Sequence, residues 1–147
     1  MVICIFYQFV VKYPKRWCNC EKNISFFNFG NSVGYEKVVS DTVNSFCKAT
    51  ADMSETRTGA LVVFEKTAVL NEVAETGTLV DAQPSAELFN GIFFKNSALH
   101  DGAVIVRDGR IHSAGCILPL TQNTSLASEL GTRHRAAIGI SEQSDSI

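Results

Sequence analysis

The sequence predicts an α/β fold, in which helices pack against a central sheet. From Tyr35 to Met53, apolar side chains recur every third or fourth residue, which is the spacing of one face of a helix. Ala60 to Phe64 is a continuous apolar run, typical of a short strand that is buried on both faces. Of the 147 residues, 46% are hydrophobic and 19% are charged, a balance that fits one packed domain.

The helical face of residues 35–53 is expected to lie in the core, with its members Val39, Val43, Phe46, Thr50 and Met53. Arg57-Thr58-Gly59 is predicted to be the turn that leads into the strand at Ala60. The next stretch, Leu70 to Val80, is interpreted as a looser β-like segment broken at Thr76-Gly77.

The second half of the chain begins with a helix predicted from about Ser85 to Ile92, with Leu88, Phe89 and Ile92 inward. Pro84 suits its first turn, because proline is tolerated there. A β-branched run then leads to Arg107, and Asp108-Gly109 is a signal for a two-residue hairpin turn of type I′.

The return strand of this hairpin is predicted from Arg110 to Leu118, before Pro119. Thr121 to Ser125 is expected to be a polar loop. A last helix is predicted from about Arg133 to Glu142, with Thr132 as its N-cap.

The N-terminal part, residues 1–30, is treated as a separate segment. Met1 to Val11 is apolar but too short to span a bilayer, which takes about 20 residues. It can be a membrane-proximal segment or simply a first strand, and Lys12 to Gly30 is predicted to be irregular. The formal net charge of -2 provides no general basic field for nucleic acid. The irregular spacing of the five cysteines indicates reduced thiols in a cytoplasmic protein.

Two stretches contain candidate functional residues. In the first, Leu99-His100-Asp101-Gly102-Ala103, a carboxylate stands at the mouth of the buried strand that follows. Asp101 can hold Mg²⁺ or Mn²⁺, or orient a hydroxyl for attack on phosphorus, and His100 is a possible metal or phosphate ligand. The small residues after Asp101 let a ligand approach the backbone. A simple Asp-Gly turn is the alternative interpretation.

The second stretch is Gly131-Thr132-Arg133-His134-Arg135-Ala136-Ala137, at the start of a predicted helix. Free backbone N–H groups and the positive end of the helix dipole favour an anion there. The guanidinium groups of Arg133 and Arg135 match phosphate oxygens. The alternative is that both arginines are solvated surface charges.

These two motifs, in this order, resemble the D-G-A and R-H-R motifs of the diadenylate cyclase domain family, and the likeness runs from about Tyr35 to Ile147. The strand Gly59 to Glu65 and the turn Cys116-Ile117-Leu118-Pro119-Leu120 also resemble that family. The resemblance implies a mixed central sheet flanked by helices. It also implies a reaction in which two subunits meet face to face, each holding one ATP, to form cyclic di-AMP and pyrophosphate with Mg²⁺ or Mn²⁺.

The resemblance further assigns roles to individual residues. Asp101 would be the catalytic residue and a metal ligand, and His100 is a possible second metal ligand on the chemistry of its side chain alone. The ATP-binding residues would be Gly102, Ala103, Leu118, Thr132, Arg133, His134 and Arg135. Leu118 would contact adenine, and the last four residues would contact the triphosphate. Ile117 stands where family members often carry an aromatic residue, so weaker stacking on adenine is expected.

Residues 31–147 would form the cyclase domain, which is expected to be incomplete at its C-terminus, with its last strands missing. The likeness is to the membrane-anchored type, so the domain is expected to be cytoplasmic in a parent protein at the membrane. Two other functions stay open at this point. One is a module that binds ATP or cyclic di-AMP without turnover, and the other is a structural domain without a nucleotide.

Overall fold

The computed structural model describes residues 3–5, 33–123 and 131–146 of the chain. The predicted irregular stretch from Lys12 to Gly30 and the end of the polar loop at Thr124-Ser125 lie outside these residues. Of the N-terminal segment, Ile3–Ile5 forms strand β1, as the first-strand interpretation expected.

A five-stranded sheet forms the centre of the molecule, in the order β1-β2-β4-β5-β3. The strands after β1 are β2 (Ala60–Phe64), β3 (Thr78–Ala82), β4 (Ala103–Arg107) and β5 (Arg110–Cys116). β2 and β4 are parallel, whereas β1 with β2, β4 with β5 and β5 with β3 pair antiparallel. The sheet is therefore mixed, and the α/β prediction is confirmed.

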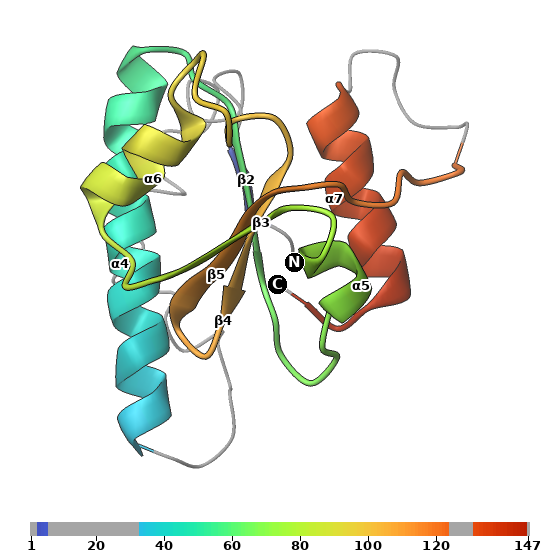
Figure 1. Ribbon diagram of the computed structural model, residues 1–147, viewed down its shortest axis with the longest axis horizontal. Helices are drawn as coiled ribbons and strands as arrows, with labels where there is room; N and C mark the ends of the chain where they lie inside the picture. Colours follow the sequence, from blue (N-terminus) through green and yellow to red (C-terminus); the bar gives the residue numbers. More distant parts are fainter. Residues whose placement is uncertain (1–2, 6–32, 124–130, 147) are drawn as a thin grey trace.

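Helices cover both faces of the sheet (Figure 1). α4 (Val33–Glu55) and α6 (Ala86–Phe93) lie on one face, and α5 (Asn71–Ala74) and α7 (Thr132–Gln143) lie on the other. The predicted bounds of α4, α6 and α7 are confirmed to within two residues. Ser85 caps α6, because its Oγ accepts a hydrogen bond from the N–H of Leu88 at 3.1 Å. Among the described helices, none is long and apolar enough to cross a membrane.

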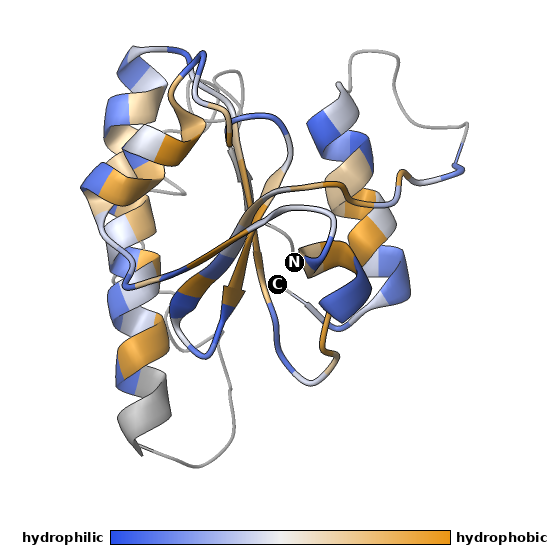
Figure 2. Ribbon diagram, in the orientation of Figure 1, coloured by the Kyte–Doolittle hydropathy of each residue, from blue (hydrophilic) through white to orange (hydrophobic). Residues whose placement is uncertain are grey.

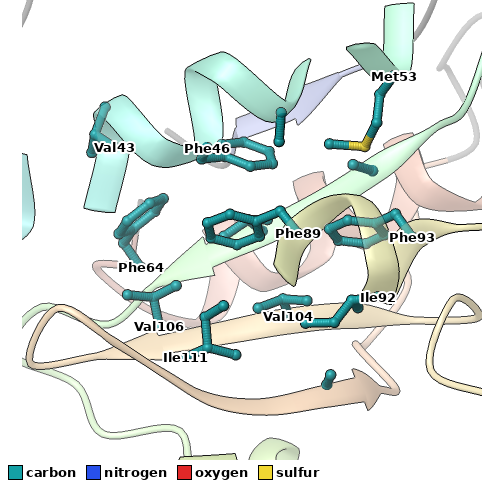
Figure 3. Close-up of a cluster of buried hydrophobic side chains, with 14 of the residues drawn as sticks. Val43, Phe46, Met53, Phe64, Phe89, Ile92, Phe93, Val104, Val106 and Ile111 are labelled. Atoms are coloured by element: carbon teal, nitrogen blue, oxygen red, sulfur yellow. The ribbon is translucent and has the colours of Figure 1, made fainter. Parts of the chain in front are cut away.

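The larger hydrophobic cluster fills the space between the sheet and the α4–α6 layer (Figure 3). Phe46 of α4 and Phe89 of α6 meet there, with ring centroids 5.0 Å apart and planes tilted by 57°. Of the predicted helical face, Val39, Val43, Phe46 and Met53 are buried and Thr50 is half-buried. This packing holds α4 and α6 together as one layer.

A second hydrophobic cluster lies between the other face of the sheet and α7. Successive residues of β2 point to alternate faces, so Val62 joins the first cluster and Leu61 and Val63 join the second. Burial on both faces explains why β2 and β4 are hydrophobic for most of their length, whereas α4 alternates between hydrophobic and hydrophilic residues (Figure 2).

The hairpin between β4 and β5 has the predicted turn. Asp108 and Gly109 have φ angles of 51° and 71°, and two consecutive positive φ angles define type I′. The return strand ends at Cys116, two residues before the predicted end at Leu118.

The prediction of a β-like segment from Leu70 to Val80 is wrong in its first half. Residues 71–74 form the short helix α5, and β3 begins only at Thr78. Leu70 and Val73 are three positions apart, the helical spacing, and both pack against the second cluster. A single turn is too short to display this period clearly in sequence.

The prediction that the cysteines are reduced is also wrong for Cys47, which is disulfide-bonded, whereas Cys116 is a free, buried thiol. Spacing along the chain could not reveal this, because it says little about which cysteines the fold brings together.

A charged cluster lies at the carboxyl ends of β2 and β4. Glu65 is only 6% exposed and accepts hydrogen bonds from Arg107, one of them from Nη2 at 2.8 Å. Arg107 Nη1 contacts His112 Nε2 at 3.0 Å, and its Nη2 donates to Asn71 at 3.0 Å. The bond to Glu65 holds the pKa of Arg107 above its ordinary value. The buried carboxylate is therefore fully compensated.

Helix α7 approaches the segment after β5 very closely at Gly139. A Cβ at this position would lie 2.2 Å from the carbonyl oxygen of Pro119 and 2.8 Å from the nitrogen of Thr121. Both contacts are with backbone, which cannot turn aside as a side chain can. The second cluster thus depends on a glycine in the middle of a helix, where it is otherwise unfavourable.

We expect Gly139→Ala to destabilise the protein by about 1–3 kcal/mol through overpacking, as measured by urea denaturation. The control is Gly91→Ala in α6, where a new Cβ meets nothing within 4 Å. It should stabilise the protein by about 0.5–1 kcal/mol. A gain of stability in both variants would contradict the close approach of α7.

Candidate active site

An open pocket of about 1170 Å³ lies at the edge of the sheet opposite the charged cluster. The segments before β2 and before β4 contribute to it, because these strands are parallel and start at the same edge. β5 is antiparallel to β4 and ends there. The lining also includes the end of α6 and the start of α7, and comprises Thr56–Gly59, Leu61, Phe93–Lys95, His100–Ala103, Gly115–Leu118, Leu120, Thr132, Arg133 and Ala136.

The pocket faces the amino ends of the parallel strands, whereas α/β sheets commonly place ligands at the carboxyl ends. Asp101 does stand at the mouth of β4, as predicted, but on the amino side of the strand. It is exposed in a bend that lines the pocket. Its carboxylate is therefore accessible to a ligand.

Gly102 has a structural role that the sequence did not reveal. Its φ is +120°, and a Cβ there would lie 2.7 Å from both the Cys116 carbonyl oxygen and the Gly115 carbonyl carbon. The backbone before β4 therefore passes directly against the end of β5. Gly102 has no side chain, and this allows the close approach. The next residue, Ala103, is buried in the pocket lining and pairs with Cys116 in the sheet.

A hydrogen bond to the carbonyl group three residues earlier orients the imidazole of His100. Its Nδ1 lies 2.6 Å from the carbonyl oxygen of Ser97, which can only accept, so Nδ1 donates. In the neutral ring, Nε2 then carries the lone pair. This is the arrangement that metal-binding histidines adopt, with one ring nitrogen fixed by a carbonyl and the other available.

Arg133 connects the two motifs. Its Nη2 donates a hydrogen bond of 2.8 Å to the carbonyl oxygen of His100. One contact of this kind leaves other N–H donors of the guanidinium for a ligand. The structure thus brings α7 and the Asp101 segment to the same pocket, as the sequence predicted for Arg133 and Asp101.

The other residues of the second motif are placed differently. Thr132 lines the pocket, but the helix begins one residue earlier than predicted, with Gly131 as the N-cap, so the prediction that Thr132 caps α7 is wrong. His134 and Arg135 are not among the lining residues. Residues one and two positions after Arg133 point about 100° and 200° around the helix, whereas Ala136, three positions on, returns to the pocket side.

Leu118 and Ile117 both line the pocket. Leu118 is 7% exposed, and Ile117 is 71% exposed. Beside them, burial raises the pKa of the Cys116 thiol. A thiol that stays protonated is a poor nucleophile, so the lining is suited to binding and positioning rather than to covalent catalysis by Cys116.

The ends of α4 and α6 contribute to the pocket in a way that the sequence did not reveal. Arg57 and Lys95 both line the pocket, whereas the sequence of Arg57-Thr58-Gly59 predicts only a turn. With Arg133, the lining carries three cationic side chains and one carboxylate, that of Asp101, although the whole chain has a net charge of -2. A basic residue just before a buried strand was the signal that could have found Arg57.

The fold and this cationic pocket define an α/β domain suited to an anionic ligand such as a nucleotide. Comparison with known proteins agrees with this class. Residues 47–147 match the family model described as DisA bacterial checkpoint controller nucleotide-binding, the DAC domain. The chain belongs to this family.

The chain is similar to the cyclic di-AMP synthase CdaA of Bacillus subtilis, with 43% identity over 112 residues, which are 76% of this chain and 41% of CdaA. The structure is similar to that of a DacA double mutant from Staphylococcus aureus, with a TM-score of 0.70, 43% identity, and coverage of 78% of this chain and 74% of that one. It is also similar to a Bacillus cereus structure described as a hypothetical membrane spanning protein, with a TM-score of 0.64, 30% identity, and coverage of 95% and 80%. The chain spans less than half the length of the curated relatives it matches.

His134 also makes a local contact that generates a prediction about pH. Its Nδ1 accepts a hydrogen bond of 3.2 Å from the N–H of Gly131, and burial lowers the pKa of the imidazole below its ordinary value of 6.5. The unfolded chain therefore binds this proton more readily than the folded chain. The corresponding stability is present above pH 6.5 and is lost as the pH falls through the lowered pKa.

We expect His134→Gln to keep the bond to Gly131, since glutamine suits this helix position, and to remove the titration. The loss of thermal stability between pH 7 and pH 5 should then be smaller in the variant, as measured by circular dichroism at each pH. Identical pH profiles for the two proteins would show that His134 is not responsible.

Proposed function

We propose that this chain provides the ATP-binding and catalytic residues of a diadenylate cyclase, which joins two ATP molecules into cyclic di-AMP and releases two pyrophosphates. The observation that supports this most directly is the hydrogen bond from Arg133 to the His100 carbonyl, which unites both motifs in one cationic pocket. The similarity to a cyclic di-AMP synthase supports the same reaction. Residues 31–147 would belong to the cyclase domain.

In this proposal, the pocket binds one ATP. Leu118 contacts adenine, and Arg133 and Thr132 bind the phosphates, since all three line the pocket. Leu118, which is 7% exposed, offers a small apolar contact beside the polar lining residues, which suits a base next to its phosphates. Stacking on adenine at Ile117 would be weak, because an aliphatic side chain replaces an aromatic ring.

The chemical step joins two such ATP molecules. The 3′-oxygen of one attacks the α-phosphorus of the other, a new phosphorus–oxygen bond forms, and the bond to the β-phosphate breaks so that pyrophosphate leaves. Asp101 orients the 3′-hydroxyl and takes its proton. In a second attack the two nucleotides exchange roles, so that a second phosphorus–oxygen bond closes the ring and the second pyrophosphate leaves. Because one pocket presents one nucleotide, two subunits would meet face to face, and positioning with charge neutralisation would provide most of the catalysis.

The residues present fit a divalent metal ion bound together with ATP. The exposed carboxylate of Asp101 and the oriented Nε2 of His100 are both in the lining. No group of three or more metal-ligating side chains occurs among the described residues. Mg²⁺ commonly binds through one or two carboxylates together with phosphates and water, so such a group is not required. When bound, Mg²⁺ or Mn²⁺ would neutralise phosphate charge.

We further propose that the domain is cytoplasmic and belongs to a membrane-anchored protein. The Bacillus cereus structure described as a hypothetical membrane spanning protein supports this. Fractionation of cells that produce the protein from its native locus would place it in the membrane fraction, and recovery in the soluble fraction alone would contradict the anchor.

The direct test is to incubate the protein with ATP and Mn²⁺ or Mg²⁺ and to detect cyclic di-AMP by chromatography. The assay is run on this chain and on the protein that its native locus encodes. We expect product from the protein of the native locus. ATP binding by both proteins without product from either would favour a binding module.

We expect Asp101→Asn to abolish product formation and to leave ATP affinity within about twofold. The change is nearly isosteric but removes the negative charge needed for the hydroxyl proton or the metal. Titration calorimetry measures binding, and chromatography measures product. The control is Asp108→Asn, the same change in an Asp-Gly turn outside the pocket lining, which should keep both properties. Near-normal turnover in the Asp101 variant would remove this residue from the mechanism.

We expect Arg133→Ala to weaken ATP binding by about tenfold or more, because charge-assisted hydrogen bonds contribute about 1.5–3 kcal/mol. Adenosine, which has no phosphates, should lose much less affinity. Arg110→Ala serves as a matched control, since Arg110 pairs with Asp81 outside the lining. Equal losses for ATP and adenosine would contradict a phosphate contact.

A further inference from the structure

We propose that Arg57 is a second phosphate-binding residue of the pocket, reaching the nucleotide from the α4 wall while Arg133 reaches it from α7. This inference rests on the proposed function and deepens it. Neither the motifs nor the resemblance assigned Arg57 a role.

The backbone of Arg57 is in the left-handed region, with φ of 54°. It follows the end of α4 in a Schellman motif, because the Arg57 N–H bonds the Ser54 carbonyl at 3.3 Å and the Thr58 N–H bonds the Met53 carbonyl at 2.8 Å. Glycine usually occupies this position, since a Cβ is unfavourable there. Arginine therefore stands where the local structure prefers another residue.

Among the described residues, four that are not glycine have positive φ angles: Arg57, Asp81, Asn96 and Asp108. Three of these are aspartate or asparagine, which tolerate the left-handed region. Arg57 is the exception, and it lines the pocket. Residues in unfavourable backbone conformations concentrate at functional sites. The conformation of Arg57 therefore indicates that its side chain has a function in the pocket.

The position of Arg57 suits a ligand that also contacts Arg133. α4 and α6 lie on one face of the sheet and α7 on the other (Figure 1). The pocket is lined by residues from both of these layers at the sheet edge. Arg57 follows α4, and Lys95 lies two residues after the end of α6. Both cations are exposed. Polyphosphate held between the layers would receive guanidinium donors from both sides, and arginine binds phosphate with a planar pair of donors.

A purely local role is the competing explanation. A cation just beyond a helix C-terminus interacts favourably with the helix dipole. That role predicts that replacing Arg57 by glycine changes stability only. The ligand-binding role predicts a different pair of effects, in which the protein becomes more stable while its affinity for ATP falls.

The test uses the full chain and the variants Arg57→Gly and Arg57→Asn, both of which suit a left-handed backbone. Arg57→Gly is expected to raise the Tm by about 2–4 °C, because the unfavourable backbone is relieved. Both variants should bind ATP about tenfold more weakly in titration calorimetry and should bind adenosine with unchanged affinity. The matched control is Asp108→Gly, another left-handed position, which lies outside the lining and should keep its ATP affinity.

Unchanged ATP affinity in both Arg57 variants would overturn the inference, and so would equal losses for ATP and adenosine. Failure of the unaltered chain to bind ATP would instead overturn the proposed function itself. Measuring the unaltered chain first keeps these two results distinct.

Discussion

The parallel pairing of β2 with β4 is the constraint on which the rest of the structure depends. The register sets Val62 beside Val104 and Phe64 beside Val106, and both strands are buried on both faces. Parallel neighbours require a long crossover, which here contains α5, β3 and α6. The same pairing brings the residues before both strands to one edge, so Arg57 and Asp101 share a pocket although 44 positions separate them in the sequence.

The two edges of this parallel pair have opposite character. At the carboxyl edge, Glu65, Arg107 and His112 satisfy one another, so this charged cluster holds strand ends together. At the amino edge, the polar groups face an open pocket, and Asp101 and Arg57 are exposed. Removing one partner of the buried pair would leave an uncompensated charge, whereas the groups at the amino edge are in contact with solvent. At one edge charge holds strand ends together, and at the other it lines an open pocket.

The sequence predicted those parts of the fold that repeat a pattern over several turns or strands. α4, β2 and the type I′ hairpin are confirmed, and Asp101 and Arg133 both line the pocket. The short helix α5 was missed because one turn shows no period. His134 and Arg135 lie outside the lining because a helix turns by about 100° per residue, which adjacency in sequence conceals. Arg57 was missed because the spacing of apolar residues predicts which side chains are buried. It does not predict which helix ends lie at the same pocket.

The contact at Gly139 has a consequence for how the pocket can change shape. The segment after β5 is held against α7 by this backbone approach and by the hydrogen bond from the Thr121 N–H to the Arg135 carbonyl at 3.1 Å. Leu118 and Arg133 are therefore held together on one side of the pocket, and α4 packs on α6 around Phe46 and Phe89 on the other. The hydrogen bond from Arg133 to the His100 carbonyl joins the two sides, because His100 lies in the segment that follows α6, and a wider pocket would break it.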